Sequence, residues 1–514
     1  MRQDTTDKST SVNQPAKVLT KAGAHNFRIH VVIPHGYTKI DYEAFSSRSD
    51  IISVIIPESV TTIDRYAFVN CKNLTEITIP NSVTAMGACA FEGCNKLTNI
   101  TIPNNITAID KYTFANCKNL TNLTIPNNIT TIDKNAFHGC EKLTNLTIPN
   151  SVTTISARAF ADCKNLTNLT IPNSVIDIGA YAFANCEKLT NLTIPNTMAM
   201  IDNGVFHGCK NLTDITISDS VTTIGAYAFA DCENLTNLTI PNSVTTIGAY
   251  AFADCENLTN LTIPNSVTTI GAYAFADCKK LTDIKIPNSI TSLEKYVFFG
   301  CRKLTNITIS DKVTIVDNSA FEDCGGVKNI VLPDGVTSIG ARAFYNCYNL
   351  IMAIPNGVTS IGARAFYNCK SLTDIIIPEG VTSINEQTFF GCCNLISIII
   401  PNGVTSIGVS AFEDCENLIN ITIVPDSITS IGKNAFFGCK NLTSIIIPKG
   451  VTTIDAGAFA DCENLTAITI PDSVTRMEYG IFDWCSNLVV SCSKNAYAHK
   501  YCRQNNIPVK IIEQ

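Results

Sequence analysis

Cysteine is the reactive residue type that is most regularly placed in this chain. The chain has 514 residues and 23 cysteines, and one cysteine returns every 23 positions from Cys71 to Cys347. Thiols in this number can form disulfides, bind zinc or pack as small apolar groups. Zinc sites need close pairs with further ligands nearby, whereas Cys392 and Cys393 form an isolated adjacent pair. We therefore expect buried structural thiols, with disulfides between turns as the alternative.

Two further predictions concern the exposure of the last three cysteines and the cellular compartment of the protein. Cys485, Cys492 and Cys502 lie outside the strict series and are expected to be the most exposed. So many unpaired thiols fit a reducing compartment better than an oxidising one, which favours a cytoplasmic location.

Residues that could support catalysis or ion binding follow the same period. The chain has six histidines, and His138 and His207 occupy equivalent positions three turns apart instead of forming a cluster. An aspartate column, Asp231, Asp254 and Asp277, could attract calcium but lacks the several convergent oxygens that the ion needs. The sequence therefore predicts no catalytic residues, no cofactor and no metal site.

The elements that position these residues repeat with the cysteines. A phenylalanine precedes each regular cysteine by three positions, and these phenylalanines count twenty turns from Phe45 to Phe482. Residues 220–242 recur letter for letter at 243–265. A fixed period of this length indicates a solenoid, in which each unit is stabilised by stacking on its neighbours.

Each unit divides into two arms. A Leu-x-x-Leu/Ile-x-Ile run alternates as a strand with one buried face does, and a following proline ends the strand. The run Gly-x-x-Ala-Phe then predicts a single helical or 3₁₀ turn. The residue before cysteine is usually Gly, Asn or Asp, which tolerate a left-handed backbone. The predicted fold is an α/β solenoid with a parallel sheet on one face and short helical or 3₁₀ turns on the other.

Composition sets the predicted domain limits and excludes some partners. Residues 1–27 are polar and are expected to be a disordered tail without a signal-peptide stretch; 28–488 form the solenoid and 489–514 a C-terminal cap. The net charge is −7, without a basic cluster along the repeats, so nucleic acid is not an indicated partner. No run approaches the ~20 apolar residues of a membrane span.

The repeat resembles the BspA-like class of leucine-rich repeat. The stretch 235–255 shows the pattern, with Leu235, Pro241, Gly248, Phe252 and Cys255 at its marker positions. The resemblance covers roughly residues 28–488, and the tail at 495–508 resembles the short helix and final strand that often close such arrays. It implies a leucine-rich repeat fold, a cell-surface or secreted location, adhesion or binding of host or matrix proteins, and no catalytic residues.

The outward strand positions offer one candidate binding surface. Most turns place asparagine and threonine there, which can exchange hydrogen bonds between turns. Val331, Ile376, Ile399 and Ile446 replace the threonine and would form an exposed apolar column. The alternative is drift toward another good strand former.

A tyrosine stripe is the second candidate surface. Tyr227, Tyr250, Tyr273 and Tyr296 occupy one equivalent position in four consecutive turns, two residues before the phenylalanine. Tyrosine suits interfaces, and the alternative is packing along the solenoid's own flank.

The period slips twice near the apolar column. The interval from Phe344 to Phe366 is 22 residues, and that from Phe412 to Phe436 is 24, with Val424 as the extra residue. These slips predict local bulges in the strands.

Three functions remain open from the sequence. The first is a non-enzymatic protein-binding solenoid at the cell surface that acts in adhesion or host-protein binding. The second is an intracellular scaffold, or an effector delivered without a standard signal. The third is a structural or water-ordering array. The oligomeric state is not predicted.

Overall fold

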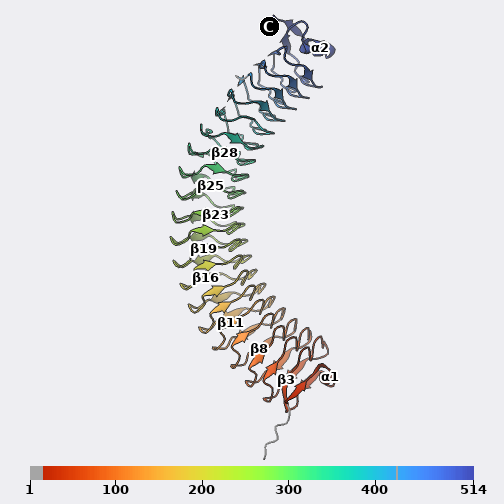
Figure 1. The fold of residues 1–514 in the computed structure, drawn as a ribbon, viewed down its shortest axis with the longest axis vertical. Helices are drawn as coiled ribbons and strands as arrows, with labels where there is room; N and C mark the ends of the chain where they lie inside the picture. The colour runs from red at the N-terminus through yellow and green to blue at the C-terminus, as the bar shows by residue number, and fades with distance from the viewer. Residues whose placement is uncertain (1–15, 424–425, 514) are drawn as a thin grey trace, which may run out of the picture. The chain divides into compact units, whose positions relative to one another are not determined.

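The computed structural model describes residues 16–423 and 426–513 and consists of about 21 turns of ~23 residues. It divides into two compact units, Met1–Leu189 and Thr190–Gln514. Within each unit, short strands stack turn upon turn as parallel ladders (Figure 1). Unit 1 holds α1 and β1–β15, and unit 2 holds β16–β40 and α2.

The first strand series carries the outward polar residues. Its strands are β2 (His30–Val32), β4 (Ser53–Ile55), β6 (Glu76–Thr78), β8 (Asn99–Thr101), β10 (Asn122–Thr124), β12 (Asn145–Thr147) and β14 (Asn168–Thr170) in unit 1, and β16 (Asn191–Thr193), β18 (Asp214–Thr216), β20 (Asn237–Thr239), β22 (Asn260–Thr262), β24 (Asp283–Lys285), β26 (Asn306–Thr308), β30 (Asp374–Ile376), β31 (Ser397–Ile400), β33 (Asn420–Ile423), β35 (Ser444–Ile446), β37 (Ala467–Thr469), β39 (Val489–Cys492) and β40 (Val509–Ile511) in unit 2. The central residue of the three-residue strands in the repeats faces the core, as the alternation predicts; Ile100 of β8 is 6% exposed. In β40, after the repeats, the central residue Lys510 is exposed.

A second series of short strands lies after the proline of each turn. Its strands are β1 (Lys17–Leu19), β3 (Tyr37–Ile40), β5 (Thr62–Ile63), β7 (Ala85–Met86), β9 (Ala108–Ile109), β11 (Thr131–Ile132), β13 (Thr154–Ile155) and β15 (Asp177–Ile178) in unit 1, and β17 (Met200–Ile201), β19 (Thr223–Ile224), β21 (Thr246–Ile247), β23 (Thr269–Ile270), β25 (Ser292–Leu293), β27 (Ile315–Val316), β28 (Ser338–Ile339), β29 (Ser360–Ile361), β32 (Ser406–Ile407), β34 (Ser430–Ile431), β36 (Thr453–Ile454) and β38 (Arg476–Met477) in unit 2. The strand pairing of this second series was not predicted from the sequence.

The register of both ladders follows the repeat. Asn122 pairs with Asn99 and Thr131 pairs with Ala108, so equivalent residues of consecutive turns lie side by side. Asn122 Nδ2 also donates to Asn99 Oδ1 at 3.4 Å, as expected for like residues stacked at strand spacing.

The arm between the second strand and the cysteine is not helical, which corrects one part of the predicted fold. Its residues form tight turns, and the only helices among the described residues are α1 (Lys21–Ala24) and α2 (Tyr497–Gln504). The N–H groups alternate between two acceptors: Phe68 N donates to Ala90 O of the next turn at 2.8 Å, whereas Cys71 N donates to Phe68 O at 3.2 Å. Because every second N–H is committed to the next turn, the helical i→i−4 bonds cannot form.

Two left-handed residues in each arm explain this geometry. The residue before the cysteine has positive φ, as predicted; examples are Gly93 (70°) and Asn116 (58°). The residue two positions before the phenylalanine also has positive φ, as at Tyr112 (58°) and Arg158 (57°). This second position could not be recognised from the residue types, because tyrosine and arginine disfavour the left-handed region.

The core is a column of phenylalanine rings inside each unit. In unit 1 the distance between consecutive ring centroids ranges from 4.9 Å for Phe45 and Phe68 to 5.6 Å for Phe91 and Phe114. In unit 2 they lie between 5.2 Å, for Phe436 and Phe459, and 6.0 Å. The rings are buried together with the leucine and cysteine of each turn, so consecutive turns complete one another's core.

Both ends of the array carry extra elements. The prediction of a disordered tail over 1–27 is wrong for residues 16–27, because β1 pairs with β3 and Leu19 and Ala24 are fully buried; residues 1–15 lie outside the described residues. Residues 489–513 contain β39, α2 and β40, the helix and strand expected for the cap. In the described parts of the chain, no helix has the length and apolar character needed to cross a membrane.

The first period slip interrupts the first strand series. Between β26 and β30, strand pairing is reduced to isolated bridges from Asn329 to Asn306 and to Ile351. At the second slip, Val424 and Pro425 lie outside the described residues.

Candidate functional site

The four apolar residues predicted to face outward are exposed. Val331 is 81% exposed, Ile376 66%, Ile399 44% and Ile446 72%, while the isoleucines on either side of Ile376, Ile399 and Ile446 are buried. The alternation of the strand places the middle residue of each triple-isoleucine run in solvent. Val331 differs from the other three because it lies in the segment of isolated bridges and not in a strand.

These residues do not form the continuous column that the sequence predicted. Ile376 pairs directly with Ile399, but Thr422 is the next partner of Ile399. Ile446 pairs with Thr469 on its other side. The column is therefore one isoleucine pair, with Ile446 separated from it by a polar turn.

Two further exposed isoleucines lie directly before strands β31 and β33. Ile396 is 41% exposed and Ile419 is 42% exposed, and Ile419 N donates to Ile396 O at 3.0 Å across consecutive turns. We call Ile376, Ile396, Ile399 and Ile419 the isoleucine patch. The signal was present in the sequence, since isoleucine replaces the usual threonine directly after Leu395 and Leu418.

Unit 1 has a similar set of exposed apolar residues that sequence reasoning missed. Ile29, Val32, Ile52 and Ile55 are 48%, 60%, 39% and 51% exposed. Ile55 pairs with Val32 between β4 and β2, so this set lies on the first two turns. The same threonine-to-isoleucine replacement marks it in the sequence.

The tyrosine stripe is stacked on itself. Ring centroids are 4.6 Å apart for Tyr227–Tyr250 and 4.4 Å apart for Tyr250–Tyr273 and Tyr273–Tyr296. Tyr250 and Tyr273 pack against the buried alanines of consecutive turns, and burial followed by the neighbouring tyrosines raises the pKa of Tyr273 to about 12. These contacts agree with packing along the array's own flank. Partner binding by the stripe stays a prediction.

The cysteines are present as thiols, and all but Cys393 and Cys485 are buried. The thiol of each regular turn donates to the phenylalanine carbonyl of the preceding turn, as Cys255 Sγ does to Phe229 O at 3.2 Å. Burial raises the pKa of Cys117 to about 12, so this thiol is almost entirely protonated at neutral pH and unreactive.

The cysteines near the C-terminus are arranged differently from the prediction. Cys492 and Cys502 are fully buried, so the expectation that they are exposed is wrong. They pack inside the cap formed by β39 and α2. Cys485 is half-buried, and its Sγ donates to Phe459 O at 3.1 Å. A hydrogen bond from Cys462 lowers the pKa of Cys485.

The polar groups considered for catalysis or metal binding lie along the flank of the turns. His138 Nδ1 and His207 Nδ1 are each 3.4 Å from an aspartate oxygen of the next turn, Asp162 and Asp231 respectively. Among the described residues, no group of three His, Cys, Asp or Glu side chains is placed to hold a metal ion.

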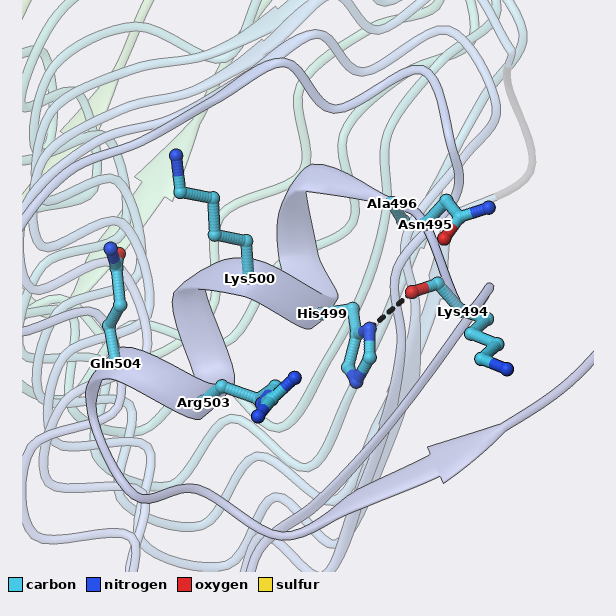
Figure 2. Close-up of a pocket in the computed structure, with 7 residues that line it drawn as sticks. All are labelled: Lys494, Asn495, Ala496, His499, Lys500, Arg503 and Gln504. Carbon is cyan, nitrogen blue, oxygen red and sulfur yellow. Dashed lines mark hydrogen bonds between the residues drawn. The ribbon is translucent and has the colours of Figure 1, made fainter.

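A basic hollow lies beside the cap helix. Figure 2 shows Lys494, His499, Lys500 and Arg503 around α2, and the hollow has a volume of about 470 Å³. His499 Nδ1 is hydrogen-bonded to Lys494 O (Figure 2). The opposite face of α2 buries Ala498, Tyr501 and Cys502, so the basic residues form the solvated side of an amphipathic helix.

The family model for the BspA-type leucine-rich repeat region, which spans six copies of the repeat, matches residues 38–167, 130–259, 245–373 and 359–489. The chain belongs to the BspA-type leucine-rich repeat family. No curated protein sequence matches this BspA-type chain.

Solved leucine-rich repeat structures are similar to this BspA-type protein. One from Bacteroides ovatus is 26% identical, covering 90% of this chain and 92% of that one, with a TM-score of 0.32. A leucine-rich cell surface protein from Faecalibacterium prausnitzii is 27% identical, covering 70% and 87%, with a TM-score of 0.35. A leucine-rich repeat protein from T. pallidum is 30% identical over 31% of this chain and 78% of that one, with a TM-score of 0.29.

Proposed function

We propose that this BspA-type protein is a non-enzymatic binding protein whose isoleucine patch contacts another protein. The observation that carries the proposal is the exposure of Ile376 and Ile399 side by side on an otherwise Asn/Thr-rich strand face. Exposed contiguous apolar surface is unfavourable in water and marks contact sites when polar residues surround it.

The chemistry of the patch favours a protein over a small molecule. Small-molecule sites are concave and bury most of their ligand, whereas Ile376 and Ile399 lie on outward positions of consecutive short strands. Its isoleucines are stiff at χ1 and lose little side-chain freedom when a partner covers them. A partner that presents complementary apolar side chains gains the free energy of burying both surfaces.

Adhesion to a host or matrix protein is the specific function that we propose. It is supported by the family, whose resemblance implies host-protein binding, and by the Faecalibacterium relative described as a cell surface protein. Val331, Ile446 and the tyrosine stripe are proposed as secondary contacts. The buried thiols do not weigh against an exterior location, because protonated, enclosed thiols resist oxidation.

The test is the double substitution Ile376→Asp with Ile399→Asp. We expect at least a tenfold loss of binding to purified matrix proteins, because two charges would be desolvated in the contact. The matched control is Thr239→Asp with Thr262→Asp, which introduces the same charges at the same paired strand positions. Equal binding by the folded double variant and the wild type would contradict the proposal.

An adhesin and an intracellular scaffold predict opposite results when thiols are labelled on intact cells. The half-buried thiols Cys393 and Cys485 are the accessible ones. A membrane-impermeant maleimide should label them on intact cells if the protein is an adhesin, and only after lysis if it is a scaffold or effector inside the cell.

A further inference from the structure

One residue breaks the rule that holds at the left-handed position before the cysteine. In the twenty turns this position has φ between 53° and 70°. In nineteen turns it is occupied by Ser, Asn, Asp or Gly: Ser47, Asn70, Gly93, Asn116, Gly139, Asp162, Asn185, Gly208, Asp231, Asp254, Asp277, Gly300, Asp323, Asn346, Asn368, Gly391, Asp414, Gly438 and Asp461. In the last turn it is Trp484, with φ 62°.

Tryptophan is a poor choice for this backbone. A bulky side chain in the left-handed region is a steric outlier, whereas Asn, Asp and Gly adopt it readily. Tyrosine and arginine do occupy the other left-handed position of many turns, so Trp484 is exceptional for its position in the turn. Trp484 is also the single tryptophan of the chain and is 69% exposed. The indole ring lies edge-on to the ring of Phe437, with the two ring centroids 6.3 Å apart.

Trp484 is one of the residues that line a small hollow between the last turn and the C-terminal cap. The hollow has a volume of about 260 Å³, and Asp483, Ser486 and Asn505 line it together with Trp484. Asn505 Nδ2 donates to Tyr501 O at 2.9 Å, which orients the amide and keeps Oδ1 as an acceptor.

The wall of this hollow is rigid. Tyr501 also lines it and is 8% exposed, and its hydroxyl accepts a hydrogen bond from Ile481 N at 3.3 Å. The Tyr501 ring lies edge-on to Phe482 at 6.4 Å. The polar rim is therefore held by the packed junction between the last turn and α2.

We propose that this hollow binds a sugar ring of a glycan. A sugar ring has an apolar C–H face, which suits the face of an indole, and hydroxyl groups around its edge. The carboxylate of Asp483, the hydroxyl of Ser486 and the amide of Asn505 supply acceptors and donors for those hydroxyls. The volume is below the ~300–1,000 Å³ of drug-sized sites, so it fits one or two rings and not a peptide surface.

The single tryptophan makes the proposal directly measurable. The full-length protein is titrated with three probes: N-acetylglucosamine tetramer, maltotetraose and lacto-N-tetraose. Stacking of a sugar on the indole should shift the emission of Trp484 to shorter wavelength and saturate for at least one probe. Trp484→Asn should weaken that binding at least about tenfold in calorimetry. Tyr479→Ala is the matched control, because Tyr479 is 77% exposed in the same turn but does not line the hollow.

Three results would overturn the proposal. The first is the absence of any saturable emission change with the three tetrasaccharides at millimolar concentration. The second is a response to tetramethylammonium or a trimethyllysine peptide alone, which would make the site a cation site built from Trp484 and Asp483. The third is a large drop in the urea midpoint of Trp484→Asn, which would show that Trp484 closes the stack and has a structural role.

Discussion

At the scale of single residues, the recurring cysteine has a defined role in bonding. Its thiol donates to the phenylalanine carbonyl of the preceding turn, and the same carbonyl accepts the backbone N–H of its own turn's cysteine. Phe68 O, for example, accepts from Cys94 Sγ at 3.2 Å and from Cys71 N at 3.2 Å. The sequence showed that the residue is small and buried, but not that it is a donor. That partner could not be predicted, because it depends on the offset between two turns.

The aspartate column offers a pH-dependent prediction. Burial, followed by the neighbouring Asp231 and Asp277, raises the pKa of Asp254 to about 6 from its ordinary value of 3.8. Because the pKa of Asp254 is higher in the folded state than in the unfolded state, its protonation stabilises the fold. This contribution is complete below about pH 4 and is lost as the pH rises through about 6. Replacement by asparagine should therefore stabilise the protein at pH 8 and have no effect at pH 4.

We expect Asp254→Asn to raise the free energy of unfolding at pH 8 by about 1 kcal/mol, a figure reduced for partial exposure. Asparagine suits the left-handed backbone and can donate to Asp231, as Asn185 does to Asp162 at 2.9 Å. Urea unfolding at the two pH values is the measurement, with Asp334→Asn on an exposed turn as the control. An equal gain at both pH values would rule out the titration of Asp254 as the cause.

At the scale of elements, the strands were predictable and the opposite arm was not. The alternation of Leu-x-x-Leu-x-Ile identified the first strand series and its buried face, and Ile376, Ile399 and Ile446 are exposed as that alternation requires. The Gly-x-x-Ala-Phe arm has the apolar spacing of a helical turn. Its hydrogen bonds instead connect consecutive turns, and no single turn contains the information needed to predict such bonds.

The left-handed turn predicts the opposite order of stability for alanine and glycine variants from the order expected in a helix. Asn116 has φ 58°, so Asn116→Ala should lower the free energy of unfolding by about 1 kcal/mol and Asn116→Gly should change it by less than about 0.5 kcal/mol. In a helix, alanine would be the better replacement and glycine the worse. Urea midpoints for the two variants decide between these orders, and a more stable alanine variant would contradict the left-handed turn.

At the scale of the whole molecule, the sequence predicted the repeat and its family, and it placed the isoleucine pair in solvent. It did not predict Ile396 and Ile419 as neighbours of that pair, although the replacement of threonine was visible at both positions. Neither did it single out Trp484, although the residue types at the position before the cysteine mark this tryptophan as the exception.

Whether each turn adds a fixed contribution to the stability of the array can be tested by deleting one turn. Deletion of residues 243–265 leaves a junction with unchanged neighbours, because residues 220–242 are identical. We expect a folded protein with the same circular dichroism per residue and a stability lower by about one turn-to-turn interface. Deletion of 243–253 is the control, since a partial turn shifts the register and exposes buried side chains. A partial deletion that folded equally well would show that register does not limit the array.

The identity of residues 220–242 and 243–265 has a genetic consequence. Insertion or removal of these 23 residues adds or removes one complete turn. Because β20 and β22 pair residue for residue, from Asn237 with Asn260 to Thr239 with Thr262, the product of such a change meets the same neighbours as before. The number of turns can therefore change without remodelling the fold, and substitutions at outward strand positions can diversify the surface of each added turn.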